Sequence, residues 1–279
     1  MTEKMKIKGA SLTLYRDAPN WDGQAAFAVG QFTCETPEAG AALLNQVAEL
    51  AKAEGATAII GPMDGDTWHS YRLVTETDDS KLFLMEPGGK PHDRIAFEAA
   101  AFSPISSYFS ASVPLGSIAG DTPPEADGLR IESWDGSDPE RLFAQVHSLS
   151  CQAFAGNPFY KPISLPDFLA MYMPVVPMLK HELILFARAE DDSLAGFLFG
   201  IPNYAEGSQP QSAILKTYAS LQKGAGHALS ARFYQAATAL GYQTAIHALM
   251  HDDNLSAMRS GMNGAKVFRR YALMGRRLG

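Results

Sequence analysis

The sequence has few of the features that define secreted or membrane proteins. Only two of its 279 residues are cysteines, Cys34 and Cys151. They lie far apart in the sequence, so we expect two buried thiols rather than a disulfide or a metal pair. No apolar run is long enough to span a bilayer, and no apolar segment of the signal-peptide kind follows Met1–Lys6. These absences predict a protein of the reducing cytoplasm, with no membrane partner.

Positive charge is also scarce, since the chain has 23 Lys or Arg, 30 Asp or Glu and a net charge of −7. Residues 1–125 hold 9 basic and 17 acidic residues, against 14 and 13 in residues 126–279. An acidic protein without a basic stripe is a poor candidate for nucleic-acid binding. The acidic first half favours a cationic amine as ligand. The basic residues near the C-terminus either face solvent or neutralise a phosphate-bearing ligand; they are Arg259, Lys266, Arg269, Arg270, Arg276 and Arg277.

What is present is a globular composition, with 46% hydrophobic and 19% charged residues. This length can bury one large core or two ordinary ones. The segment Gly116–Asp127 is rich in turn formers and poor in apolar residues, which marks an exposed connection. We therefore predict two domains, residues 1–125 and 126–279.

Hydrophobic patterns in the first half predict strand, strand, helix, strand. The strands are expected at Lys6–Arg16, Gln24–Thr33 and Ala56–Ile60, and the helix follows Thr36 and Pro37. A last strand is expected at Tyr108–Val113.

The second half repeats this order in a longer form, with two helices after its first strand. Its strands are expected at residues 129–134, 182–189, 193–201, 214–219, 243–250 and 266–276, and its helices at 137–153, 165–172, 227–240 and 253–259. The central unit is the strand Ile214–Ala219, a glycine turn, and the helix that ends at Gly241.

The turn of this central unit contains Gly224 and Gly226. Glycines there let the chain turn tightly and approach a bound group, while the helix that follows begins with free N–H groups and the positive end of its dipole. Such a turn suits a diphosphate. Glycine is also the commonest turn residue, so an ordinary turn is the competing interpretation.

The stretch 221–226 resembles the acyl-coenzyme A loop of the GNAT (GCN5-related) N-acetyltransferases, Arg/Gln-x-x-Gly-x-Gly/Ala. Gly224 and Gly226 match its small positions, whereas Leu221 stands where the family has Arg or Gln. The resemblance implies a mixed α/β (α+β) fold of two GNAT-like repeats, with splayed, mostly antiparallel sheets flanked by helices. It also implies acetyl-coenzyme A as cofactor, held by Thr217, Tyr218, Ala219, Gln222, Lys223, Gly224, Ala225, Gly226, His227, Asn254 and Met258.

The first half resembles a degenerate repeat of the same family. Residues 61–72 read Gly-Pro-x-x-Gly-x-Thr-Trp-x-x-Tyr-Arg, a pattern of uncharacterised two-repeat members, and Glu86-Pro87 follows. Its hairpin-to-helix turn carries Glu35 and Glu38 in place of glycines, so we expect no cofactor there. Trp68, Tyr71 and Arg72 either pack in the core, with Arg72 paired to a carboxylate such as Glu86, or hold the acyl acceptor. No metal site is expected.

Catalytic residues are less well defined. In many family members a Tyr about seven residues after the Asn matched by Asn254 protonates the leaving thiolate, but Gly261 stands there. Tyr271 is the nearest phenol and is either this acid or a core aromatic. Base candidates are Glu206 and the run His251-Asp252-Asp253, which also reads as a helix-cap turn.

The resemblance implies transfer of an acyl group from coenzyme A to a small-molecule or peptide amine, by direct attack on the thioester. Two alternatives stay open. One is an acyl-coenzyme A binding or regulatory protein without catalysis, and the other is an aminoacyl transferase of the peptidoglycan-bridge type. A homodimer is a candidate state.

Overall fold

The computed structural model describes residues 2–118, 128–254, 260–261 and 263–279. The first half consists of the elements β1 (Thr2–Ile7), β2 (Ala10–Tyr15), β3 (Ala26–Cys34), α1 (Pro37–Ala53), β4 (Ala58–Gly61), β5 (Leu73–Thr77), α2 (Pro91–Ala99), β6 (Ser103–Pro114) and a 3-10 turn, η1 (Leu115–Ser117). The expected linker lies mostly outside the described residues.

The second half begins with β7 (Leu129–Ser133) and ends with β12 (Lys266–Arg277). Between them lie α3 (Pro139–Ala153), α4 (Leu165–Tyr172), the 3-10 turns η2 (Met173–Met178) and η3 (His181–Leu183), β8 (Ile184–Ala189), β9 (Leu194–Pro202), η4 (Tyr204–Glu206), β10 (Ser212–Ser220), α5 (Ala225–Ala239) and β11 (Thr244–His251). The expected helix at 253–259 lies outside the described residues, apart from its first two positions.

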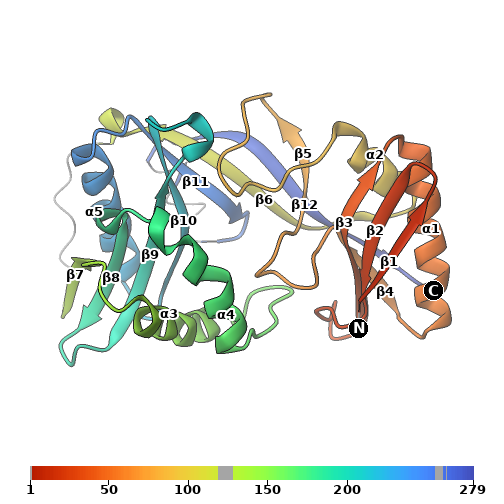
Figure 1. The fold of residues 1–279 in the computed structure, drawn as a ribbon, viewed down its shortest axis with the longest axis horizontal. Coiled ribbons are helices and arrows are strands. Elements are labelled where there is room, and N and C mark those ends of the chain that lie inside the picture. Colours follow the sequence, from red (N-terminus) through yellow and green to blue (C-terminus); the bar gives the residue numbers. More distant parts are fainter. Residues whose placement is uncertain (1, 119–127, 255–259, 262) are drawn as a thin grey trace.

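All twelve strands join one sheet, in the order β1-β2-β3-β4-β12-β6-β11-β10-β9-β8-β7, with β5 paired to β12 (Figure 1). The C-terminal strand β12 therefore inserts between β4 and β6 of the first half. In turn, β6 pairs with β11 of the second half. The two halves share their last strands, and residues 103–114 contribute to the sheet of the second half.

Two of the pairings in the described sheet are parallel, β3 with β4 and β10 with β11, and the other pairings are antiparallel. The predicted fold class, a mixed and mostly antiparallel sheet flanked by helices, is confirmed. Each parallel pair is short, with three residue pairs in the first half and four in the second.

Helix starts follow the capping signals of the sequence. The side chain of Thr36 accepts from the N–H of Ala39 at 3.2 Å, and Ser164 accepts from Asp167 at 3.3 Å. Helix α1 buries one face against the first half of the sheet, α5 against the second half, and α3 and α4 form an aromatic core with β8 and β9. No helix in the described ranges is both long and apolar enough to cross a bilayer.

The splay of the first half is filled by its own chain. Beyond the short β3–β4 pairing, the N–H of Met63 donates to the carbonyl of Val29, and a carboxylate oxygen of Asp64 accepts from the N–H of Gln31 at 2.7 Å. A Cβ placed on Gly30 would lie 2.3 Å from that carboxylate, so the fit requires glycine. Residues 62–64 therefore occupy the place that is open in the second half.

Two local expectations are wrong. Lys6–Arg16 is not one strand, because a turn at Lys8 and Gly9, with φ +80° at Gly9, divides it into β1 and β2. Residues 73–77 and 91–99 form β5 and α2, which the hydrophobic pattern did not reveal.

A buried ion pair ties β12 to the first half. Arg269 Nη1 lies 2.6 Å from a carboxylate oxygen of Glu86, and the two side chains are 2% and 0% exposed. Removing one member leaves a buried charge without its partner, which costs about 3–5 kcal/mol.

We expect Arg269→Met to lower the free energy of unfolding by about 3 kcal/mol or more for that reason. The matched control is Arg270→Met, since the side chain of Arg270 is 41% exposed and makes only longer contacts, 3.6 Å to Asp252 and 3.8 Å to Glu76. That change should cost less than about 1 kcal/mol. Urea unfolding measures both, and equal losses would contradict the assignment.

Candidate active site

The splay of the second half opens between β10 and β11. The two strands pair only from Ser212–Leu215 to Thr244–His247. Beyond that point β10 continues against β9 and β11 continues against β6, so the facing edges of residues 216–220 and 248–251 separate. A β-bulge at Lys216, between Leu215 and Thr217, marks the point of separation.

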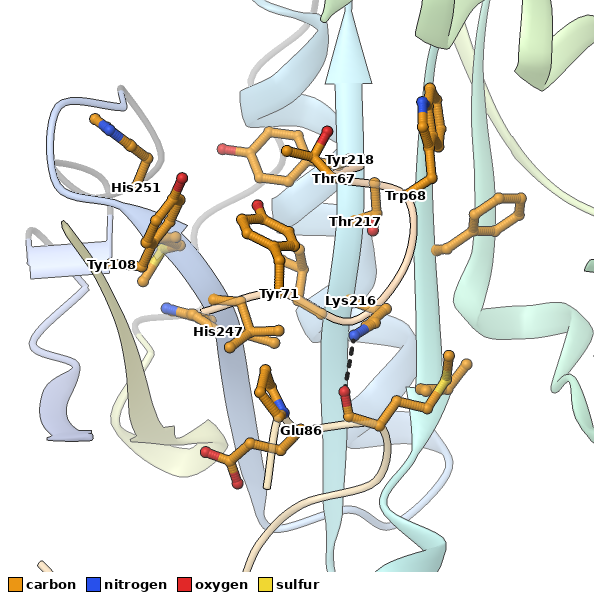
Figure 2. A pocket seen from close by; sticks show the side chains of 18 of the residues that line it. Thr67, Trp68, Tyr71, Glu86, Tyr108, Lys216, Thr217, Tyr218, His247 and His251 are labelled. Atoms are coloured by element: carbon orange, nitrogen blue, oxygen red, sulfur yellow. Dashed lines mark hydrogen bonds between the residues drawn. The ribbon is translucent and has the colours of Figure 1, made fainter. Parts of the chain in front are cut away.

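A cavity of about 710 Å³ lies in this splay. Both halves contribute to it (Figure 2). The second half supplies β10, β11, α5 and the aromatic side of α3 and α4, and the first half supplies the loops at 67–72 and 85–88 and one residue of β6, Tyr108. Its polar and charged lining includes Tyr71, Arg72, Glu86, Tyr108, Lys216, Thr217, Tyr218, Tyr234, His247, His251 and Asn254.

The glycine turn brings six of the expected cofactor residues to the start of α5. Gly224 has φ +90° and caps the helix without a side chain, and there is no acidic residue in the first turn. In the described chain, no acceptor was found for the N–H groups of Gly224, Ala225 and Gly226. Gln222, Lys223 and His227 are exposed around them. The turn therefore offers free N–H groups and a positive dipole end to an anion.

The other expected cofactor residues divide among cavity, core and undescribed chain. Thr217, Tyr218 and Asn254 line the cavity. The side chain of Ala219 is 6% exposed and packs into the aromatic core, so only its main chain could face a ligand. Met258 lies outside the described residues.

His251 begins a hydrogen-bonded line that ends in the cavity. Its Nδ1 accepts from the N–H of Asp253 at 3.1 Å, which leaves the proton of the neutral ring on Nε2, 3.1 Å from Ser106 Oγ. Ser106 Oγ donates to the hydroxyl of Tyr108 at 2.9 Å. Because each group in the line donates to the next, Tyr108 keeps its own proton free to donate into the cavity.

Tyr108 was not among the residues singled out from sequence. It reaches the cavity because β6 runs antiparallel to β11, with Tyr108 directly opposite His251. The ring planes of the two residues meet edge to face at 5.1 Å. No local pattern could have revealed this, since Ser106 and His251 are 145 positions apart.

Two expected catalytic residues lie outside the cavity. Tyr271 is 1% exposed, and its hydroxyl bonds to Glu86 and, at 3.0 Å, to Ser110. Burial and the Glu86 carboxylate raise the pKa of Tyr271, and its ring packs in a core cluster, which is the second of its two interpretations. The carboxylate of Glu206 accepts from Asn203 at 2.9 Å, from Ser212 and from the N–H of Gln211 at 2.7 Å.

Glu206 therefore holds a turn together and does not line the cavity. Burial alone would raise its pKa, but the hydrogen bonds outweigh that effect and hold the pKa below its usual range.

The two acidic residues that follow His251 differ in their surroundings. A carboxylate oxygen of Asp252 lies 3.6 Å from Arg270, and the side chain of Asp253 is 93% exposed.

The first half contributes Trp68, Tyr71 and Arg72 to the cavity lining. This position agrees with the interpretation in which they contact a ligand. The indole N–H of Trp68 donates to the carbonyl of Lys161 at 2.8 Å, and its ring packs edge-on against Phe154, Tyr160 and Phe168. It anchors the first-half loop on the second half. The expected pairing of Arg72 with Glu86 is wrong, because Glu86 binds Arg269.

A second cluster of hydrogen-bonded side chains lies where the splay begins, around His247. His247 is 3% exposed, with Nε2 2.9 Å from the Tyr234 hydroxyl and Nδ1 2.7 Å from Ser260 Oγ. Asn263 donates to the same hydroxyl at 3.1 Å. Burial raises the pKa of Tyr234 to about 12 and lowers that of His247 to about 4, so both are neutral at pH 7.

Away from the cavity, ligand atoms of Cys34, His92 and Asp93 lie within 4.8 Å of one another. Burial, reinforced by the hydrogen bond to Asp93, raises the pKa of the Cys34 thiol to about 11. A metal would need the thiolate, which this environment disfavours.

No protein-family model and no curated protein sequence matches the chain. Its fold is similar to that of a tandem GNAT protein from the clavulanic acid biosynthesis pathway, with a TM-score of 0.55, 14% identity, and coverage of 97% of this chain and 79% of that one. It is also similar to a GCN5-related N-acetyltransferase from Sphaerobacter thermophilus, with TM-score 0.55, 15% identity and coverage of 97% and 81%.

A GCN5-related N-acetyltransferase from Anabaena variabilis ATCC 29413 matches at TM-score 0.57 and 12% identity, over 97% of this chain and 60% of that one. The chain therefore has the GNAT fold in a two-repeat arrangement, and the resemblance stated from sequence is confirmed for the fold. Acyl transfer is compatible with it.

The buried neutral imidazole of His247 makes stability depend on pH. In the unfolded chain a histidine titrates near pH 6.5, against about 4 here, so between these values the unfolded state binds more protons. Stability is fully present above pH 6.5 and falls as the pH drops toward 4, by at most about 3 kcal/mol. Urea unfolding across this range should show the loss.

His247→Gln, which keeps hydrogen-bonding capacity, should flatten that part of the profile. The control His227→Gln removes an exposed imidazole from the start of α5 and should leave it unchanged. A profile equally steep in all three proteins would contradict the assignment.

Proposed function

We propose that the chain is an acyl-coenzyme A dependent N-acyltransferase, with acetyl-coenzyme A as donor, whose site is the splay between β10 and β11. The observation that carries the proposal is the combination of an open splay and an uncapped α5 in the same half. The first half has neither, because residues 62–64 fill its splay and the side chain of Thr36 caps α1.

The diphosphate of the donor would bind the free N–H groups of 224–226, with Lys223 as a flanking cation. These residues fit such a group because their N–H donors have no acceptor among the described residues, the N-cap residue is a glycine, and no acidic residue lies in the first turn. Asn254 lines the cavity and could bond to the pantetheine arm.

The edge of β10 at Thr217–Ala219 would receive the acyl end. This edge has no strand partner on the β11 side, so main-chain N–H groups there could polarise the carbonyl as charge develops on its oxygen. The bound thioester supplies the acyl group that an amine attacks, and the cavity walls hold the amine in line.

Tyr108 would supply the proton that the leaving sulfur needs. Its free O–H faces the cavity, and Ser106 and His251 behind it can return a proton to the phenolate. The proton lost by the attacking amine would bind Nδ1 of His251 in place of the hydrogen bond from Asp253, so that the ring stays neutral when Nε2 gives its proton to the line. The line would thus take the place of the tyrosine that many GNAT members have about seven residues after the position of Asn254, where this sequence has Gly261.

A binding protein without turnover is the second candidate. It is favoured by Leu221, whose 48% exposed side chain offers no charge to a phosphate. It would bind the donor yet need no proton line. An aminoacyl transferase would require a basic groove for RNA, and the positive residues described here lie in separate places.

Lys223→Glu tests donor binding. The change puts a negative charge where the diphosphate would lie, while a Glu before the first helical turn favours α5 itself. Affinity for acetyl-coenzyme A should fall about tenfold or more at low salt, measured by calorimetry. The control Lys8→Glu makes the same charge change between β1 and β2, which lie at the opposite end of the molecule from α5 (Figure 1), and should have no effect. Equal affinity in all three proteins would reject the site.

Tyr108→Phe tests turnover. The phenyl ring keeps the packing and loses only the hydroxyl, so kcat on a panel of amines should fall about 100-fold while acetyl-coenzyme A affinity is unchanged. Tyr172→Phe, another cavity tyrosine, is the control. An unaffected kcat would remove the proton line from the mechanism, and no turnover in wild type alongside tight binding would favour the second candidate.

A further inference from the structure

The cavity is positively charged inside an acidic protein. Apart from histidines, the charged side chains that line it among the described residues are Arg72, Lys216 and Glu86. Glu86 is fully buried, and both its oxygens lie within 2.7 Å of Arg269 Nη1, behind the wall. Its Oε2 also accepts from the N–H of Phe83 at 2.9 Å. The charge of Glu86 is thus neutralised, and two cations remain.

Neither cation has a carboxylate partner in the described chain. The Lys216 amine donates to the carbonyl of Met85 at 3.3 Å, and Arg72 Nη1 donates to the carbonyl of Leu249 at 3.0 Å (Figure 2 shows Lys216). Carbonyl oxygens satisfy donors without supplying a negative charge. An anion is the missing component.

The guanidinium of Arg72 is fixed in orientation. Its central carbon lies 3.8 Å from the ring centre of Tyr71 and 3.9 Å from that of Tyr108, one ring belonging to the preceding residue and one to β6. The residue is 6% exposed, and Nε is sealed off by protein atoms. Nη1 is used by Leu249, so Nη2, which has no hydrogen-bond partner among the described residues, is the nitrogen left for a ligand. A planar guanidinium suits a carboxylate.

Lys216 occupies the bulge at which β10 leaves β11. Burial, with a further contribution from Arg72, lowers its pKa to about 8, while Glu86 opposes the shift. At pH 7 the amine is still mostly protonated, although its surroundings stabilise that form less than water would. A bound anion would stabilise that form and would lie beside Thr217–Ala219, the strand edge proposed for the acyl carbonyl.

The far side of the cavity is apolar. Side chains of α3, α4 and the neighbouring strands line it, among them Phe143, Phe154, Met171, Tyr172, Leu179 and Phe199. A ligand that fills the cavity needs an anionic end and an apolar body.

We propose that Arg72 and Lys216 bind a carboxylate of the acyl acceptor, and that the acceptor is an α-amino acid with a large apolar side chain. The inference rests on the proposed function. In an α-amino acid the amine and the carboxylate share one carbon. A carboxylate held at Lys216 therefore puts the nitrogen beside the strand edge and the apolar side chain toward the aromatic wall. The acidic first half led us to expect a ligand with net positive charge. The two cations of the cavity favour instead a ligand whose amine is accompanied by a carboxylate.

Calorimetry on the full chain tests the carboxylate site without turnover. Phenylalanine, leucine and tryptophan are titrated alongside their amides, in the presence of coenzyme A. At least one acid should bind about tenfold or more tightly than its amide, since the amide lacks the charge. If no acid binds more tightly than its amide, the proposal is wrong.

Arg72→Gln and Lys216→Met should each weaken binding of that acid about tenfold or more and leave acetyl-coenzyme A affinity within about twofold. The control Lys180→Met removes an exposed charge outside the cavity and should change neither. Two separate variants keep the test decisive if one fails to fold by circular dichroism. Unchanged acid binding in both would overturn the site.

A carboxylate could also be carried by the acyl group. Succinyl-coenzyme A is therefore titrated against acetyl-coenzyme A. If the two variants weaken only succinyl-coenzyme A, the assignment to the acceptor is overturned. If acetyl-coenzyme A does not bind the wild-type protein, the proposed function is refuted. The comparison of acids with amides tests the carboxylate site independently of that result.

Discussion

The antiparallel pairing of β6 with β11 is the constraint on which the site depends. It brings Tyr108 opposite His251, and the pairing of β6 with β12 on its other edge joins the two halves into one sheet. Without the exchanged strands, the splay would lose Tyr108 and the hydrogen-bonded line behind it, and Arg72 would lack one of its two rings. The halves thus cooperate in one cavity, although their boundary in sequence looks like a division between independent domains.

The two splays show how one architecture serves two purposes. In the first half, residues 62–64 and the close fit at Gly30 turn the opening into packed core. In the second half, the opening is kept, and loops of the first half form its opposite wall. The loops at 67–72 and 85–88 thus make the first half a wall of its neighbour's cavity.

Local features could be predicted because their causes are local. The glycine turn before α5, the cap at Thr36 and the strands of the second half follow from turn chemistry and periodicity over a few residues. The same reasoning found the aromatic loop containing Trp68 and the run containing His251, both of which line the cavity.

Features that depend on distant pairings could not be predicted. Tyr271 and Glu206 were attractive as isolated titratable groups, and only the contacts of Tyr271 with Glu86 and of Glu206 with Ser212 identify them as structural. The partner of Glu86 is on the last strand, so pairing it with Arg72 was a natural error. The charge of the cavity was hidden for the same reason, because the acidic residues of the first half mostly face solvent.

The central claim is that the second splay, and not the first, receives acyl-coenzyme A. Amide hydrogen exchange with and without acetyl-coenzyme A tests it most directly, since each splay and its helix start give separate peptides. The account predicts slower exchange in residues 215–230 and unchanged exchange in residues 26–40. Protection in residues 26–40, or none in residues 215–230 at saturating ligand, would contradict it.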